Sequence, residues 1–313
     1  MIYNITNSGI SLKDRKIYDF PADLVANCVS EPHAVHPKFY YKGDFLGNGK
    51  QQILAVLANN PLSLPKNNVE TKCYLFDLDD KNAEPIDLGQ PFIFNVDFLE
   101  AENTNGYFDT NNSDRLYIVD YDGDGKSDIL LVNSNGTHIY TFIPDEEYYI
   151  FYGVESYIIQ HVATYNGLKL EGLYNKLLFA GDFNGDGKHD LLLSPFVNST
   201  SSNWDIFYSK GDGSFENIST NIFPFTINSY TNTRFFLQDV NSDGMTDIIS
   251  YTNGVFNTRI SKGKEFVSSE SVTMSNNSSD KIQLIPININ ANNPVHIIAL
   301  KNNNITILSS SII

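Results

Sequence analysis

One short pattern, repeated along the chain, limits what this sequence can fold into. Residues 182–190 read Asp-x-Asn-Gly-Asp-Gly-Lys-x-Asp and stand between two apolar runs, 177–180 and 191–193. Side-chain oxygens fall at loop positions 1, 3, 5 and 9, and the glycine at position 6 permits a sharp turn. This spacing predicts a loop that wraps a hard cation, because alternate side chains point inward and the main-chain carbonyl of position 7 joins them.

The pattern recurs in five loops, each between apolar runs: 44–52, 120–128, 182–190, 239–247 and 288–296. The three central copies keep the full set of side-chain oxygens. In the first copy Leu46 and Gln52 stand in two of the oxygen positions, and the last copy has no carboxylate. We therefore expect cations at the three central loops and turns that bind calcium poorly at the two outer ones. Internal repetition on this scale predicts a repeat array or a propeller.

Two other interpretations of the loops are weaker. An EF-hand needs a glutamate at loop position 12 and flanking helices, but position 12 is Leu131, Leu193 or Ser250 inside apparent strands. Asp and Gly also form turns without metal. Several carboxylates packed into one tight loop would repel each other without a cation, however, and the spacing is the same three times. Calcium is favoured over magnesium because all the expected ligands are protein oxygens on a flexible loop.

Each repeat has a similar expected plan, in which one apolar strand enters the loop, a second leaves it, and a third follows a polar turn. The expected third strands are 73–76, 138–142, 204–208, 257–260 and 305–308. The expected fourth strands are 91–94, 148–151, 222–223 and 267–274. Residues 146–168 are the best helical candidate, and we interpret them as strands and loop because no window holds a sustained 3.6-residue period.

These elements predict an all-β fold. The motif starts are 49 to 76 residues apart, which suits four-stranded antiparallel sheets of short strands. The last repeat ends after its third strand, and the N-terminal segment could supply the missing fourth strand. We therefore expect residues 1–313 to form a single β-propeller domain of five blades, closed by the N-terminal strand. The alternative is six blades, if the longest interval or the N-terminal segment holds a blade without the motif.

Charge and composition exclude several function classes. The chain carries 37 Asp and Glu against 21 Lys and Arg, a formal net charge of −16, which argues against nucleic acid and against docking on an anionic membrane. No segment approaches the ~20 apolar residues of a membrane-spanning helix, so no membrane insertion is expected. The N-terminus shows no signal-peptide pattern. We favour two unpaired thiols at Cys28 and Cys73, although the sequence leaves their pairing open.

The loop sequences resemble those of the FG-GAP/VCBS repeat family, on residues 181–193 and on the tail 209–215. The resemblance covers roughly residues 39 to 308. Within the family, the sequence is most similar in style to the propellers of Tc-toxin B, RHS and SpvB-like bacterial proteins. It implies a β-propeller, as in integrin α heads, with Ca²⁺ at about three sites. The implied side-chain ligands are Asp120, Asp122, Asp124, Asp128, Asp182, Asn184, Asp186, Asp190, Asp239, Asn241, Asp243 and Asp247. The implied main-chain ligands are the carbonyls of Lys126, Lys188 and Met245.

No catalytic set stands out in the sequence, so we expect no enzyme and no catalytic residues. His33 and His36 form an isolated His-x-x-His, and no Gly-x-Ser-x-Gly elbow occurs. The expected function is a non-catalytic, calcium-stabilised module that docks a protein partner, within a larger secreted, cell-surface or toxin-like bacterial protein. The alternative is a carbohydrate-binding propeller or an enzyme acting on polysaccharides, for which Trp204 could stack on sugars. We expect Trp204 to fill the core instead.

Overall fold

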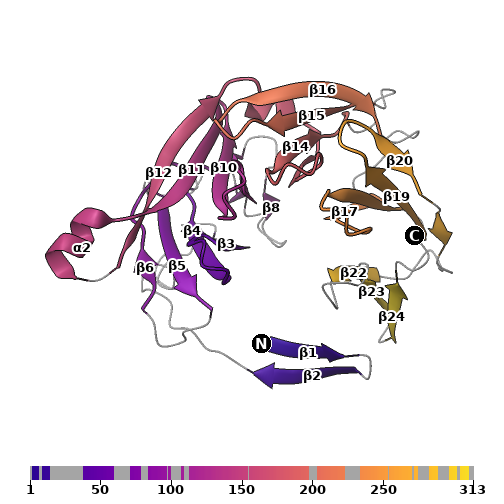
Figure 1. Ribbon diagram of the computed structural model, residues 1–313, viewed down its shortest axis with the longest axis horizontal. Helices are drawn as coiled ribbons and strands as arrows, with labels where there is room; N and C mark the ends of the chain where they lie inside the picture. Colours follow the sequence, from indigo (N-terminus) through magenta and orange to yellow (C-terminus); the bar gives the residue numbers. More distant parts are fainter. Residues whose placement is uncertain are drawn as a thin grey trace. The chain divides into compact units, whose positions relative to one another are not determined.

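Figure 1 shows the computed structural model of the protein. The structure describes residues 2–6, 9–14, 38–59, 71–78, 84–96, 98–99, 107–108, 113–153, 155–196, 203–222, 233–252, 254–269, 271–273, 282–287, 296–301 and 304–309. These residues divide into two compact units. The early unit comprises residues 16–174 and 211–214, and the late unit comprises 1–15, 175–210 and 215–313. The expectation of a single domain over 1–313 stays a prediction.

The early unit holds two four-stranded antiparallel blades, in which strands that follow one another in sequence are neighbours in the sheet. The first blade consists of β3 (Lys38–Gly43), β4 (Gln52–Leu57), β5 (Lys72–Asp77) and β6 (Ile86–Asp87). The second consists of β9 (Arg115–Val119), β10 (Asp128–Asn133), β11 (Gly136–Pro144) and β12 (Tyr157–Tyr165). The unit also contains a short pair of strands, β7 (Phe98–Leu99) and β8 (Tyr107–Phe108), helix α2 (Glu146–Tyr152) and the 3-10 turn Leu170–Leu173.

The late unit holds two further blades. The third consists of β13 (Leu178–Gly181), β14 (Asp190–Leu193), β15 (Asn203–Ser209) and β16 (Phe215–Asn221). The fourth consists of β17 (Thr233–Gln238), β18 (Asp247–Thr252) and β19 (Val255–Ser261), with β20 (Phe266–Ser268) and β21 (Val272–Thr273) both paired to β19. The remaining strands are β22 (Ile282–Ile287), β23 (His296–Lys301), β24 (Asn304–Ser309), β1 (Ile2–Thr6) and β2 (Gly9–Asp14).

Burial follows the apolar runs that flank the loops. The second strand of each blade is almost wholly buried, as in β10, where five of six residues are buried. In the early unit one apolar cluster joins the first two blades, with Phe45, Leu54 and Ile129 fully buried. In the late unit a second cluster surrounds Phe183 and Trp204, both 0% exposed. Trp204 is thus a core residue, as expected, and stacks near Phe179 with the ring centroids 6.3 Å apart.

The prediction of five blades is wrong, and so is the alternative of six, because the described residues form four. The fifth repeat gives only the three-stranded sheet β22–β23–β24. The predicted closure by the N-terminal strand is also wrong: β1 pairs with β2, with Thr6 opposite Gly9, and among the described residues neither strand pairs with that sheet. Pairing two strands that are neighbours in sequence costs far less chain entropy than pairing the two ends of a long chain.

The fourth strands were predicted less well than the others. The second blade's fourth strand is β12, and the predicted strand 148–151 lies in helix α2 (Glu146–Tyr152). Asp145 caps this helix by accepting a hydrogen bond from Tyr148 N (3.0 Å), and Gly153, with φ of 66°, ends it. In the first and third blades the fourth strands are β6 and β16, before the predicted ranges 91–94 and 222–223. The range 267–274 does contain parts of β20 and β21, and all five third strands are confirmed.

Candidate metal centre

In all three central loops the aspartate at position 1 accepts two backbone hydrogen bonds from its own loop; in the 239–247 loop the donors are Asp243 N (3.2 Å) and Gly244 N (3.0 Å). In the 120–128 loop, Asp120 accepts from the backbone N–H of Gly123 (2.8 Å) and of Gly125 (3.0 Å). In the 182–190 loop, Asp182 accepts from Gly185 N (2.7 Å) and Gly187 N (2.9 Å) in the same way. The glycines have φ values of 78° to 85°, a conformation that other residues resist. The loop is therefore wound tightly around its first carboxylate.

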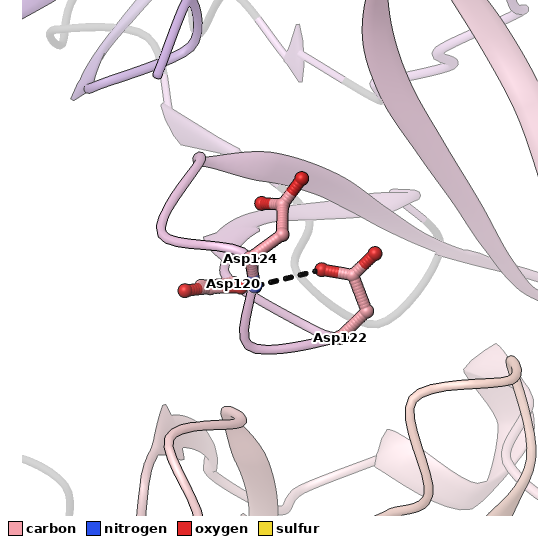
Figure 2. A group of neighbouring side chains, drawn as sticks. All are labelled: Asp120, Asp122 and Asp124. Carbon is pink, nitrogen blue, oxygen red and sulfur yellow. Dashed lines mark hydrogen bonds between the residues drawn. The ribbon is translucent and has the colours of Figure 1, made fainter. Parts of the chain in front are cut away.

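The side chains at positions 3 and 5 continue this winding. In the 120–128 loop, Asp122 accepts from Asp124 N (3.2 Å), the bond drawn in Figure 2, and Asp124 accepts from Lys126 N (2.8 Å). One carboxylate oxygen each of Asp120, Asp122 and Asp124 lies within 4.8 Å of the others. This is the only such acidic group among the residues that the structure describes. The 182–190 and 239–247 loops repeat the bonds with an asparagine at position 3, whose amide oxygen is also a suitable ligand.

The aspartate at position 9 is buried at the start of the second strand. Asp190 and Asp247 are 0% exposed and Asp128 is 1% exposed. Both oxygens of Asp190 accept backbone hydrogen bonds, from Phe183 N (3.1 Å) and from Ser209 N (2.8 Å), and Asp247 bonds Val240 N and Ser261 N (2.9 and 2.8 Å). The carboxylate thus ties the loop to the third strand of its own blade.

Electrostatics at this buried position favour a nearby cation. Burial raises the pKa of Asp128 and of Asp190 to about 7 and that of Asp247 to about 6, and neighbouring loop carboxylates add to the effect. Lysine ammonium groups pair with the position-5 aspartates at 2.7, 3.0 and 3.5 Å, and a divalent cation would add opposite charge beside position 9 and stabilise its ionised form. The donor set, made only of carboxylate, amide and carbonyl oxygens, fits a hard cation such as calcium.

The loops are also linked in pairs, which the sequence analysis did not predict. In the early unit, Ser127 at position 8 donates its N–H to the carbonyl of Asp44 (2.8 Å), and its hydroxyl accepts from Asp44 N (3.0 Å). In the late unit, Thr246 at position 8 donates its N–H to the carbonyl of Asp182. The approach is close, because a Cβ on Gly181 would lie 2.7 Å from Thr246 Cγ2. A glycine before position 1 and a small hydroxyl residue at position 8 are the sequence signals for this link.

In the first loop, 44–52, the side-chain amide of Gln52 takes the place of the position-9 carboxylate. Gln52 is 0% exposed, and its Oε1 accepts from Phe45 N (2.8 Å), as the position-9 aspartates do in the other loops. Its Nε2 donates to Asn48 Oδ1 (3.3 Å) and to the carbonyl of Lys50 (3.1 Å). These two oxygens are at positions 5 and 7, where the other loops would offer ligands to a cation. The last copy, 288–296, lies outside the described residues apart from His296.

Of the remaining cysteine and histidine candidates of the sequence analysis, only Cys73 lies among the described residues, and it belongs to no such acidic group. Cys73 is buried and free, as expected, whereas Cys28, His33 and His36 lie outside the described residues. Among the described residues, no helix is long and apolar enough to cross a membrane.

Comparisons with known proteins place these loops in a family. The model of the FG-GAP-like repeat matches residues 120–193 and 182–250. A search by sequence among curated proteins finds no match. A lectin structure from Agrocybe aegerita, described as recognising non-reducing terminal N-acetylglucosamine, has 12% identity over 88% of this chain and 80% of that chain, at a TM-score of 0.46.

A Photorhabdus luminescens Tc holotoxin pore structure has 15% identity over 86% of this chain, at a TM-score of 0.45. This chain spans 11% of that one. At TM-scores below 0.5 neither likeness carries an argument about function. The family model and the loop geometry agree, and residues 120–250 of this chain therefore carry FG-GAP-like repeats.

Proposed function

We propose that this chain is a non-catalytic, calcium-stabilised β-propeller that serves as a protein-docking module within a larger secreted or toxin-like protein. The observation that carries the calcium part is the threefold repetition of one loop geometry, with an all-oxygen donor set and a buried carboxylate at position 9. Three independent copies of that geometry would be a costly arrangement of like charges without a cation.

In this proposal each cation is held by the side chains at positions 1, 3, 5 and 9 and by the carbonyl at position 7. In the best-formed loop these are Asp120, Asp122, Asp124, Asp128 and the carbonyl of Lys126. A cation held there fixes the turn between the first and second strands of its blade. It also orders the backbone next to position 8, whose N–H bonds the neighbouring loop, so that it stabilises the contact between two blades. Binding to the folded state adds stability by mass action.

A matched pair of substitutions tests the calcium sites. Asp186→Ala removes the position-5 carboxylate from an acidic loop, and Asp44→Ala removes position 1 from the loop that Gln52 closes. We expect calcium to stabilise the wild type, by about 2.7 kcal/mol at a hundredfold excess over Kd. Asp186→Ala should lose part of this stabilisation and one bound calcium ion, and Asp44→Ala should retain both.

The readouts are melting temperature with calcium or chelator, and bound calcium by equilibrium dialysis. The absence of any melting shift upon chelation would overturn the calcium proposal. Equal loss of bound calcium in both variants would contradict the difference between the loops.

For the docking part, the full burial of Trp204 supports a protein partner over a sugar, because that ring cannot stack on a ligand. Specific signal on a glycan array would overturn the docking assignment.

A further inference from the structure

Helix α2 presents an apolar surface that no described residue of its own unit covers. It connects β11 to β12 and lies beyond the end of that pair of strands (Figure 1). No residue of the helix is buried. Its last five residues are all large and apolar or aromatic, with exposed fractions of 42% for Tyr148, 56% for Tyr149, 77% for Ile150, 73% for Phe151 and 68% for Tyr152. We call these five residues the α2 patch.

Such a helix is normally buried. A helix that is apolar all round packs against other protein or lipid, and isolated helices much shorter than ~12 residues are marginal in water. Here the two caps and the tilted ring contact between Tyr148 and Tyr152, with centroids 4.5 Å apart, hold the α2 patch in place. The patch is thus preformed, which lowers the entropic cost of binding.

A cavity adjoins the patch and gives it a specific shape. Its volume is about 430 Å³, and Pro144, Tyr149, Ile150 and Tyr157 form its apolar wall. Asp145, Glu146 and Glu155 also line it. The cavity therefore combines apolar and carboxylate side chains in its lining, which suits a bulky apolar side chain carried next to a positive charge.

The charge around the patch decides among the candidate occupants. Residues 136–165, from the start of β11 to the end of β12, contain Asp145, Glu146, Glu147 and Glu155 and no Lys or Arg. An anionic membrane would be repelled by this segment. A second copy would bring the same four carboxylates face to face, at a chain net charge of −16. A basic, apolar protein surface is complementary in both respects.

We propose that the α2 patch and its cavity are the docking site for a partner protein, which inserts a bulky apolar side chain flanked by Lys or Arg. This proposal rests on the docking role proposed above and names the surface that performs it. The aromatic residues supply the apolar contact area, as they do at the centres of other interfaces, and the carboxylates set orientation and specificity.

The test uses the full chain and two peptide sets of about twelve residues, in which one central Phe or Leu is flanked either by Lys or by Glu. Binding is measured by fluorescence anisotropy at low and at physiological salt. We expect the Lys-flanked set to bind and the Glu-flanked set not to bind. Phe151→Ser should weaken binding about 30-fold or more, as at an interface hot spot. Ile93→Ser is the matched control, because Ile93 is 66% exposed but lies outside the patch.

Charge reversal gives a second, independent readout. Glu146→Lys with Glu147→Lys should weaken the Lys-flanked peptides and allow the Glu-flanked ones to bind. Failure of both peptide sets, or equal binding of both, would overturn the proposal. So would binding to phosphatidylserine vesicles, or a dimer in sedimentation that Phe151→Ser disrupts. The variants should keep the wild-type calcium-dependent melting shift, so failure of the patch and failure of the calcium proposal are separate results.

Discussion

Replacement of Gln52 tests whether an amide takes the place of a cation in the first loop. Gln52→Ala removes three hydrogen bonds at a fully buried position. The buried N–H of Phe45 would lose its partner, which costs about 1–3 kcal/mol. The two exposed acceptors, on Asn48 and Lys50, would bond to water at little net cost. Lost burial of the side-chain methylene groups adds about 1 kcal/mol, for a total of about 2–4 kcal/mol.

The dependence on calcium is the sharper part of this prediction. Gln52→Ala should destabilise the chain equally with calcium and with chelator, because no cation is needed in this loop. Gln52→Glu keeps the acceptor for Phe45 N but turns a carboxylate oxygen toward two other oxygens. That variant should be less stable than the wild type in chelator and partly recover in calcium, since the loop then has an all-oxygen donor set.

Melting temperature and urea unfolding measure the global effect, and hydrogen exchange of the Phe45 amide measures the local one. Exchange at Phe45 should accelerate in Gln52→Ala and stay slow in Gln52→Glu with calcium. Asp190→Ala is the matched control in an acidic loop, since Asp190 also bonds the position-2 N–H of its own loop. If Gln52→Glu were as stable as the wild type in chelator and indifferent to calcium, the amide would not be acting as a substitute for a cation.

Two further predictions concern local conformation and pH. Ser242 has a φ of 62° at the loop position where the other described loops have glycine, so Ser242→Gly should stabilise the fold by roughly 0.5–1 kcal/mol in urea unfolding; a loss of stability would contradict strain at this residue. Burial and the neighbouring His161 lower the pKa of His138, whereas an unfolded histidine titrates near about 6.5. The unfolded chain then binds more protons just below that pH, so stability should fall as pH drops through it, and His138→Gln should show a smaller fall in melting temperature.

The sequence predicted the parts of the fold that the loops determine. The apolar runs on either side of each Asp-Gly loop must leave in opposite directions, so the pairing of β13 with β14, or of β17 with β18, followed from the motif. The third strands were also found correctly, because a short polar turn returns the chain beside the second strand. The position-2 residues Phe45, Phe183 and Val240 are all buried, which explains why each loop keeps an apolar residue there.

Elements far from the loops were predicted poorly, for local reasons. Residues 146–152 have the aromatic composition of a strand, but Asp145 and Gly153 supply the two caps of a helix. The strand predicted over 148–151 was wrong because it followed from the aromatic side chains and left out the capping residues. The predicted number of blades was wrong because pairing between the two chain ends leaves no signal in the sequence. The pairing of β1 with β2, which are neighbours in sequence, costs little chain entropy.

The loops also show how one turn can be closed in two chemically different ways. At position 9, Asp190 and Gln52 each accept a hydrogen bond from the position-2 N–H, and so both hold the loop against its second strand. The carboxylate brings a negative charge into a buried site and leaves the oxygens at positions 5 and 7 without a donor from position 9. The amide adds no charge and donates to both of those oxygens. Under the calcium proposal, the first loop therefore needs no cation, because it lacks the buried negative charge at position 9. Its hydrogen bond with Ser127 links the cation-binding loop 120–128 to a turn whose stability does not depend on calcium.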